Sequence, residues 1–202
     1  MFNLILKDFY LQVHLTFILV LLSFPFRNIN SNYIAFSVLI MLFSFAATME
    51  FNDRENKNNS LVILRSLPID KNIVILSKYL SSCFMYCIYV VIFQFYNFLG
   101  SNIYSNIIIN PKLIFINLLL FIVLISAYYP ISFINNKILN SSVKVAFWLF
   151  IMFLFNLWSK IRYLINYLFN LNLKNILTFT IITFRIFITS FFISKFILNK
   201  DF

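Results

Sequence analysis

The sequence predicts an all-α membrane protein that crosses the bilayer six times. Of the 202 residues, 62% are hydrophobic and 11% are charged, whereas a soluble domain of this size is about half apolar and about a quarter charged. The apolar residues also fall into long runs, and a helix of about 20 apolar residues spans the hydrocarbon core of a bilayer. A lipid bilayer is therefore the solvent that suits this composition.

Six apolar runs are long enough to span the bilayer as helices. We place them at residues 11–27, 33–50, 72–99, 112–133, 143–159 and 176–196, in a single transmembrane domain that covers residues 1–202. The third run is long enough to cross with a tilt or to continue beyond the bilayer. Residues 159–175 form either an outer loop with a short interfacial helix or a re-entrant segment, and the sequence leaves both open.

The first ten residues suit a short helix that lies in the membrane interface. Apolar Phe2, Leu4 and Phe9 are set against Lys7 and Asp8, the pattern of an interfacial amphipathic helix. An acid in the would-be basic region and the lack of a small-residue cleavage site argue against a signal peptide.

The distribution of Lys and Arg predicts the orientation in the membrane. With the N-terminus in the cytoplasm, the inner loops hold twice as many basic residues as the outer loops. The inner set is Lys7, Arg54, Lys57, Arg65, Lys71, Lys78, Lys137, Lys144, Lys195 and Lys200, and the outer set is Arg27, Lys112, Lys160, Arg162 and Lys174. Cytoplasmic loops carry an excess of Lys and Arg. We therefore expect a multi-pass protein of the cell membrane with both termini in the cytoplasm. Because the basic residues are scattered singly, we expect no nucleic-acid partner.

The loop at residues 51–71, between the second and third spans, is charged. Its first half, residues 52–59, is interpreted as a solvated lead-in. Ser60 can act as the N-cap of a short cytoplasmic helix at residues 61–66, and Pro68 cannot continue that helix. Asp70 lies near the start of the third span, where a negative charge suits the helix dipole.

This short helix exposes apolar side chains, which need a partner or a membrane to cover them. The side chains are Leu61, Ile63 and Leu64. An ordinary loop lying on the lipid surface and a helix docked on a partner protein both satisfy this requirement.

The composition also excludes some chemistry. Gly100 is the one glycine, and phosphate-binding loops of either common type need several. Cys83, Cys87 and the single His14 do not make a plausible zinc site, which normally needs three or four ligands. We interpret the two cysteines as packing thiols and expect no bound metal, no cofactor and no catalytic residues.

A few polar residues fall inside the predicted spans, where they tend to mark function or a buried partner. We take Gln94 and Asn97 in the third span and Arg185 in the sixth as a possible intramembrane polar path. Arg185 lies near the middle of its span. Alternatively, the span begins as early as Tyr163, which leaves Arg185 nearer the inner headgroups with its stem snorkelling; we favour this alternative.

Three patterns in the spans indicate helix packing. Pro130 cannot donate to the carbonyl of Ser126, which predicts a kink near the inner end of the fourth span. Small residues line one face of the second span and allow a close helix approach: Ser37, Ser44, Ala47 and Thr48. The helically spaced aromatic residues of the third span are interpreted as packing rather than as a substrate surface: Tyr86, Tyr89, Phe93 and Tyr96.

The charged loop and its flanks resemble the permease subunits of ABC-2 type transporters. The resemblance lies in an acid at the end of the second span, followed by L-x-S-L-P-I-x-(K/R)-x-x-I-V-x-x-K-Y. The matching residues are Glu50, Leu64, Ser66, Leu67, Pro68, Ile69, Lys71, Ile73, Val74, Lys78 and Tyr79. The specific match covers residues 1–80, and the six-span plan covers the rest.

The resemblance implies that the short helix is a coupling helix, which docks into a cleft on a separate ATP-hydrolysing subunit. The chain would be the permease of an ABC exporter, would pair with a second copy or a paralogue, and would leave ATP and Mg²⁺ to its partner. By hypothesis, Glu50 ties the end of the second span to a basic neighbour. The residues implied for coupling are Glu50, Leu61, Ile63, Leu64, Arg65, Ser66, Leu67 and Pro68.

Two other functions were weighed against this one. A non-transporting membrane anchor or an immunity-type subunit on the same scaffold is not separated from a permease by sequence. A membrane-embedded enzyme needs paired acids, a serine with a base or a metal set within its spans, and none of the six acids lies in the middle of a span.

Overall fold

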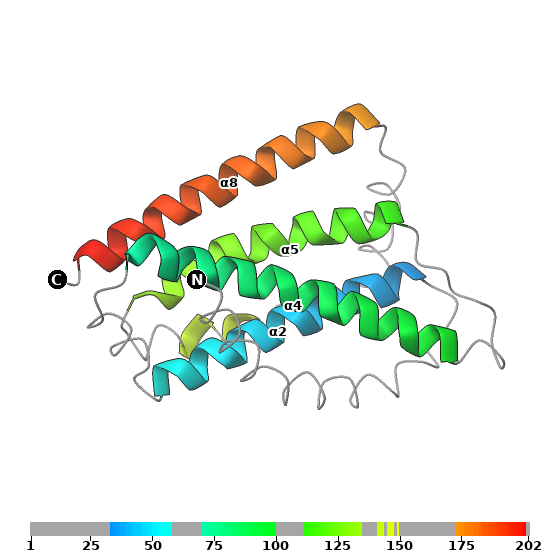
Figure 1. The fold of residues 1–202 in the computed structure, drawn as a ribbon, viewed down its shortest axis with the longest axis horizontal. Coiled ribbons are helices and arrows are strands. Elements are labelled where there is room, and N and C mark those ends of the chain that lie inside the picture. The colour runs from blue at the N-terminus through cyan, green and yellow to red at the C-terminus, as the bar shows by residue number, and fades with distance from the viewer. Residues whose placement is uncertain are drawn as a thin grey trace.

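The computed structural model describes residues 33–57, 70–99, 111–134, 141–143, 145–147, 149 and 173–200. These residues form four long helices and no strand (Figure 1). The helices are α2 (Tyr33–Lys57), α4 (Lys71–Leu99), α5 (Pro111–Ser132) and α8 (Leu173–Lys200). By length and composition, α4, α5 and α8 can each cross a membrane. The all-α membrane class is therefore confirmed for the described part of the chain.

The four helices correspond to the second, third, fourth and sixth predicted spans. The predicted starts of α4 and α5 are each within one residue, whereas α2 continues to Lys57, well beyond its predicted end at residue 50. The fifth span is helical at 143, 145–147 and 149. Residues 1–32, 58–69 and 150–172 lie outside the described part. The first span, the interfacial segment, the short loop helix and the choice between an outer loop and a re-entrant segment stay predictions.

Helices α4 and α5 lie side by side in the middle of the described bundle, and each packs on both α2 and α8 (Figure 1). The small residues of α2 lie in this interface: Ser44, Ala47 and Thr48 are fully buried. Without long side chains, the helix backbones can approach closely, which is how helices associate in lipid. The predicted close-packing face of the second span is confirmed at these three positions.

Aromatic rings fill the space between α4 and α5. Tyr79 and Tyr129 lie with their ring centroids 4.6 Å apart, and Tyr86 stacks on Phe121 at 5.2 Å. Tyr89 is fully buried. Tyr86 and Tyr89 are thus core residues, as predicted, and these offset and tilted pairs stabilise the contact beyond the area they bury.

Helix α8 has two different faces. Small polar and aromatic residues face α4 and α5: Thr183, Phe187, Ser190, Phe191 and Ser194. Large apolar residues on the remaining surface are exposed in this chain: Leu177, Ile181, Ile182, Phe184, Phe192, Ile193 and Phe196. Exposed apolar side chains on a spanning helix are the surface that lipid or another membrane helix covers.

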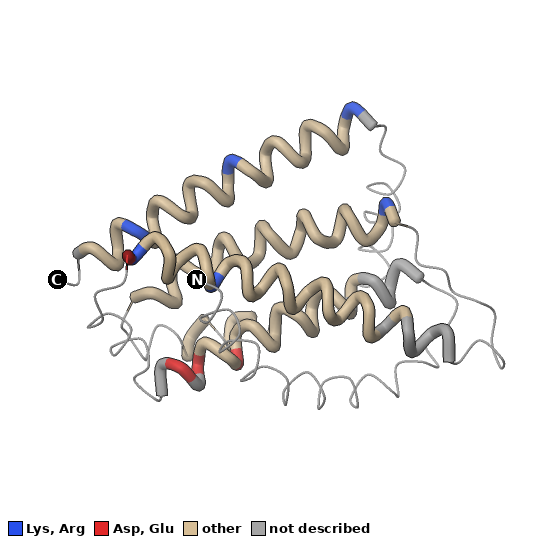
Figure 2. Tube along the Cα trace, viewed as in Figure 1, with Lys and Arg blue, Asp and Glu red and all other residues tan. Residues whose placement is uncertain are grey.

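The helices converge at one end of the bundle, which we name the loop end: α2 ends there, α4 begins there, and α5 and α8 both end there (Figure 1). The described acids, Glu50, Asp53, Glu55 and Asp70, gather at this end (Figure 2). Lys112 and Lys174 lie at the other ends of α5 and α8. The structure therefore separates the described acids from Lys112 and Lys174, which both belong to the outer set of the basic-residue count.

Labelling of engineered cysteines at the two ends of α8 tests this topology. In a variant with Cys83 and Cys87 replaced by serine, we expect Lys174→Cys to react with an impermeant maleimide added to intact cells. Asn199→Cys, at the loop end, should react only after the membrane is permeabilised, because the basic loops stay in the cytoplasm. Labelling of both sites from outside, or the reverse order, would contradict the predicted orientation.

Candidate functional site

The end of α2 is buried, although its sequence resembles a solvated loop. Phe51 is 1% exposed, Asn52 4% and Glu55 2%. The interpretation of residues 52–59 as a solvated lead-in is wrong for Asn52 and Glu55. Since α2 remains helical through Lys57, Phe51 and Glu55 lie one turn apart on the same face, and that face packs against α4.

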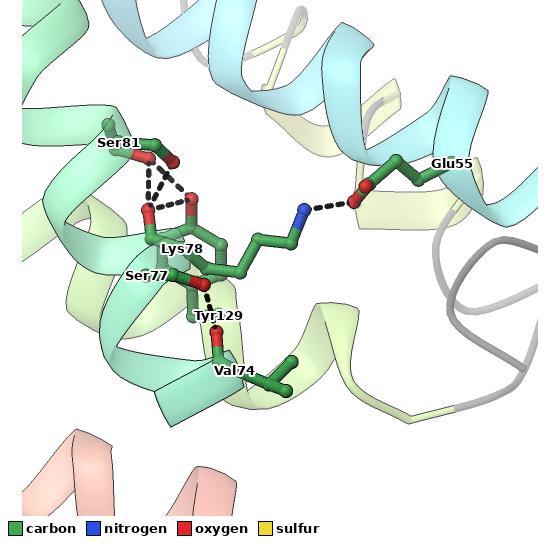
Figure 3. Close-up of polar contacts among 7 residues, drawn as sticks. Glu55, Val74, Ser77, Lys78, Ser81 and Tyr129 are labelled. Carbon is green, nitrogen blue, oxygen red and sulfur yellow. Dashed lines mark hydrogen bonds and ion pairs between the residues drawn. The ribbon is translucent and has the colours of Figure 1, made fainter. Parts of the chain in front are cut away.

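Glu55 forms a buried ion pair with Lys78 of α4 (Figure 3). Each of the two side chains is 2% exposed, and the Lys78 Nζ atom lies 4.5 Å from the ring centroid of Phe51. The ammonium group therefore has a carboxylate on one side and an aromatic face on another, and a cation is attracted to both.

The geometry of α4 explains how a lysine is accommodated here. Lys78 lies seven residues after the start of α4 at Lys71, about 10 Å along the helix. Side chains on a helix point toward its N-terminus, so the ammonium group of Lys78 is carried back toward the loop end and Glu55. Removing both charges from water costs several kcal/mol per ion, which pairing and hydrogen bonds must offset.

The backbone carbonyl of Lys78 connects α4 to α5. The Tyr129 hydroxyl donates to this oxygen at 2.9 Å and also contacts the Ser82 hydroxyl. Ser81 donates to the same carbonyl oxygen at 2.9 Å and Ser82 at 3.1 Å (Figure 3). Lys78 thus holds α2 through its side chain and α5 through its main chain.

The neighbouring residue, Tyr79, connects α4 to α8. Its hydroxyl contacts Ser190, and Ser190 donates to the carbonyl of Ser126 in α5. Because the Ser190 proton is used in that bond, the Tyr79 hydroxyl donates to Ser190. The carbonyl of Ser126 is the one that Pro130 leaves without a helical N–H donor, as the sequence predicts, and Ser190 supplies the missing donor.

Two further contacts fix the start of α4. Asp70 caps the helix, because its carboxylate accepts a hydrogen bond from the Asn72 N–H at 3.0 Å, the usual way an N-cap satisfies a free donor. The Lys71 Nζ atom donates to the carbonyl of Leu198 at 3.4 Å, near the C-terminus of α8, where the helix dipole favours a cation.

Together these contacts form a single site at the loop end, which we name the polar junction: Phe51, Glu55, Lys78, Tyr79, Tyr129 and Ser190. Its residues come from all four long helices. The two residues at its centre, Lys78 and Tyr79, are the final pair of the sequence motif, but neither was included among the candidate site residues. The sequence feature that could have identified them is a lysine inside an otherwise apolar run.

Of the predicted coupling residues, the structure describes only Glu50. Glu50 is half-buried on α2. We expected Glu50 to pair with a basic neighbour. The structure shows such an ion pair for Glu55, and the pairing of Glu50 stays a prediction. Leu61, Ile63, Leu64, Arg65, Ser66, Leu67 and Pro68 lie outside the described residues, in the segment that joins α2 to α4.

The structure describes the side chains of two of the three residues of the proposed polar path, so the path as a whole stays a prediction. Gln94 on α4 and Arg185 on α8 are both exposed and share no hydrogen bond within the described residues, and the Asn97 side chain lies outside them. Arg185 is near the midpoint of α8. The favoured alternative, a span that begins as early as Tyr163, depends on residues 163–172, which lie outside the described residues, so the depth of Arg185 in the membrane stays a prediction.

Cys83 is half-buried against the core and Cys87 is exposed, and neither forms a disulfide. The interpretation as a packing thiol fits Cys83 and is wrong for Cys87, because Cys87 points away from the core. In the described part of the chain, no three His, Cys, Asp or Glu side chains are grouped so that they could hold a metal ion.

A bundle of apolar helices joined at one end by a buried polar junction defines a polytopic helical membrane protein. The sequence matches the family model described as ABC-2 family transporter protein over residues 3–199, and the chain belongs to that family. No curated protein and no solved structure matches it. Membership implies a permease role in an ABC transporter, and permeases of this family generally work in a membrane with ABC ATPase partners.

The ion pair of the polar junction can be tested by a double-mutant cycle. We expect Lys78→Met to lower the free energy of unfolding by about 3–5 kcal/mol, because Glu55 is left as an unpaired buried charge. The double variant with Glu55→Leu should recover most of this loss, since both charges are then gone. Thermal or denaturant unfolding of the purified protein in detergent measures the effect. Additive losses in the double variant would show that the two side chains do not form a pair.

The hydrogen bond from Ser190 offers a second cycle. We expect Ser190→Ala to lower the free energy of unfolding by about 1 kcal/mol, because the carbonyl of Ser126 loses its donor. In a Pro130→Ala background the N–H of residue 130 can bond that carbonyl, so the same substitution should cost less. Ser132→Ala is a matched control, because its hydroxyl bonds only to its own helix. An equal loss of unfolding free energy for Ser190→Ala in both backgrounds would contradict the assignment of Ser190 as the donor to the carbonyl of Ser126.

Proposed function

We propose that this chain is the permease of an ABC exporter and that it is driven through residues 58–69 by a separate ATPase. The observation that carries the proposal is the Lys78–Glu55 ion pair. This pair joins α2, which precedes the segment, to α4, which follows it. A force on the segment therefore acts on both helices at once.

The polar junction provides the route by which such a force reaches the other helices. Lys78 is joined to α5 through Tyr129, and Tyr79 is joined to α8 through Ser190. Lys71, which follows the segment by two residues, bonds the end of α8. A displacement of the segment is thereby transmitted to α5 and α8 without any contact between the ATPase and those helices.

Coupling of this kind needs no nucleotide site in the permease. The chain has a single glycine and no phosphate-binding loop. We propose that ATP and Mg²⁺ are bound by the partner ATPase, that two permease subunits, identical or paralogous, enclose the substrate path, and that the complex lies in the cell membrane with its loop end in the cytoplasm. The contact with the ATPase would be made by Leu61, Ile63, Leu64 and Arg65, and the coupling segment would also include Ser66, Leu67 and Pro68.

Substitutions in the loop test the docking step. Leu64→Asp and Arg65→Glu should each reduce co-purification with an ATPase encoded beside this chain, because they place a negative charge in the docking contact. Lys174→Glu, at the other end of α8, serves as the control for added negative charge. Normal ATPase association and normal export in both loop variants would exclude the coupling role.

A separate export assay distinguishes a permease from a membrane anchor. Deletion of the gene should abolish export of the cargo, and the wild-type gene should restore it. The double variant Lys78→Met with Glu55→Leu should fold and still bind the ATPase, but should export less, since α2 and α4 are no longer held by charge. An anchor predicts unchanged export in this variant.

A further inference from the structure

Two lysines lie where the start of α4 meets the end of α8. Lys71 is the first residue of α4, and its Nζ atom donates to the carbonyl of Leu198 at 3.4 Å. Lys195 precedes Leu198 by three residues of α8, about 4.5 Å along the helix axis. Both lysines therefore belong to the loop end of the α4–α8 contact (Figure 1).

Both lysines are at the boundary of a membrane span. The candidate spans on the two helices are Lys71–Ile92 and Lys174–Asn199. Lys71 begins the first span, and Lys195 precedes the end of the second by four residues, about 6 Å. A lysine this close to the end of a span extends its stem so that the ammonium group reaches the headgroups. The phosphates of the lipids are the anions at that depth.

Lys195 is half-buried, between the packed face and the lipid-facing face of α8. On one side of it Ser194 and Leu198 are buried, and on the other side Phe192 and Phe196 are 61% and 68% exposed. Lys195 makes no hydrogen bond and no ion pair with any residue that the structure describes. Its ammonium group therefore borders an apolar surface of the kind that lipid chains cover.

The acids of α2 are on the other side of the bundle from α8. Helices α4 and α5 lie between α2 and α8 (Figure 2). The acids of α2 are Glu50, Asp53 and Glu55, and Glu55 is paired with Lys78. The described acid beside the two lysines is Asp70, which directly precedes Lys71 and accepts a hydrogen bond from the Asn72 N–H at 3.0 Å.

Two lysines and one aspartate leave one net positive charge at this place. The acids of the chain outside the described residues are Asp8 and Asp201. Asp8 directly follows Lys7, and Asp201 directly follows Lys200, so each of these acids is accompanied by a cation. The site therefore suits an anion with a single negative charge, which is the charge of a phosphodiester headgroup.

We propose that Lys71 and Lys195 bind the headgroup phosphate of an anionic membrane phospholipid, such as phosphatidylglycerol, and that its acyl chains lie on Phe192 and Phe196. Each ammonium group has three donors, and the phosphate accepts charge-assisted hydrogen bonds from both. Basic groups between spanning helices recognise anionic headgroups on the cytoplasmic side of a membrane, where we expect the loop end. The bound lipid joins α4 to α8, and the inference does not depend on the proposed transport function.

Binding of short-chain phospholipids to the purified protein in a neutral detergent tests the inference. The probes are dioctanoyl phosphatidylglycerol, dioctanoyl phosphatidylcholine and glycerol 3-phosphate. We expect the phosphatidylglycerol to raise the unfolding midpoint of the wild-type protein, with an effect that falls as salt is added. The phosphatidylcholine has the same chains but no net charge, and glycerol 3-phosphate has the charge but no chains, so both should have little effect.

Four variants make the test specific. Lys195→Gln and Lys71→Gln should each weaken the apparent affinity for phosphatidylglycerol about fivefold, the contribution of one lysine near an anionic membrane surface. Lys195→Arg keeps the charge and should bind as wild type does. Lys174→Gln removes a cation from the other end of α8 and should also bind as wild type does. If one of the two glutamine variants at the site does not fold, the other decides the result.

Unchanged affinity in Lys195→Gln, or an equal loss in Lys174→Gln, would overturn the inference, because the site would then have no part in binding beyond a general attraction of charge. Equal stabilisation by phosphatidylcholine or by glycerol 3-phosphate would overturn it as well. So would a fivefold rise in affinity in Asp8→Asn or Asp201→Asn, since that carboxylate would then already neutralise the lysines. The assay uses neither an ATPase nor a cargo, so its failure is separate from a failure of the loop variants to affect ATPase association.

Discussion

A buried ion pair close to a membrane surface constrains the helices that carry it. Lys78 and Glu55 are both almost fully shielded from solvent, so separating them would leave two charges without water or a partner, at a cost of several kcal/mol. Thermal motion rarely supplies that energy. Helices α2 and α4 are therefore expected to move as one body at the loop end, and the segment between them is attached to a rigid base.

The contacts from this base to α5 and α8 are of a weaker kind. They are neutral hydrogen bonds from Tyr129, Tyr79 and Ser190, and hydrogen bonds between membrane helices contribute about 0.6 kcal/mol on average. The strong contact thus holds α2 to α4, and the weaker hydrogen bonds join these two helices to α5 and α8. This order of strengths allows α5 and α8 to shift while the base stays intact.

The sequence was a good guide wherever a residue's own neighbours decide its structure. Apolar runs set the positions of α4 and α5, Asp70 was placed at the start of α4, and Pro130 indicated an unbonded carbonyl at Ser126. It was a poor guide to the end of α2, because Glu55 lies among polar residues that normally meet water. Its burial depends on Lys78, 23 positions away in the sequence, and no local pattern reveals that pairing.

The hydroxyls along α8 show how the weaker contacts can change partners. Tyr79 contacts Ser190 and lies 3.4 Å from Ser194, one turn further along the same face. One turn of helix is about 5.4 Å, the step by which packed helices slide past each other in known switches. A shift of α8 along its axis exchanges one serine for the other, so the Tyr79 hydroxyl keeps a partner throughout. The same shift removes Ser190 from the carbonyl of Ser126, which has no other helical donor because of Pro130. Such a shift would therefore break this hydrogen bond as well as the packing of α8 against α4 and α5.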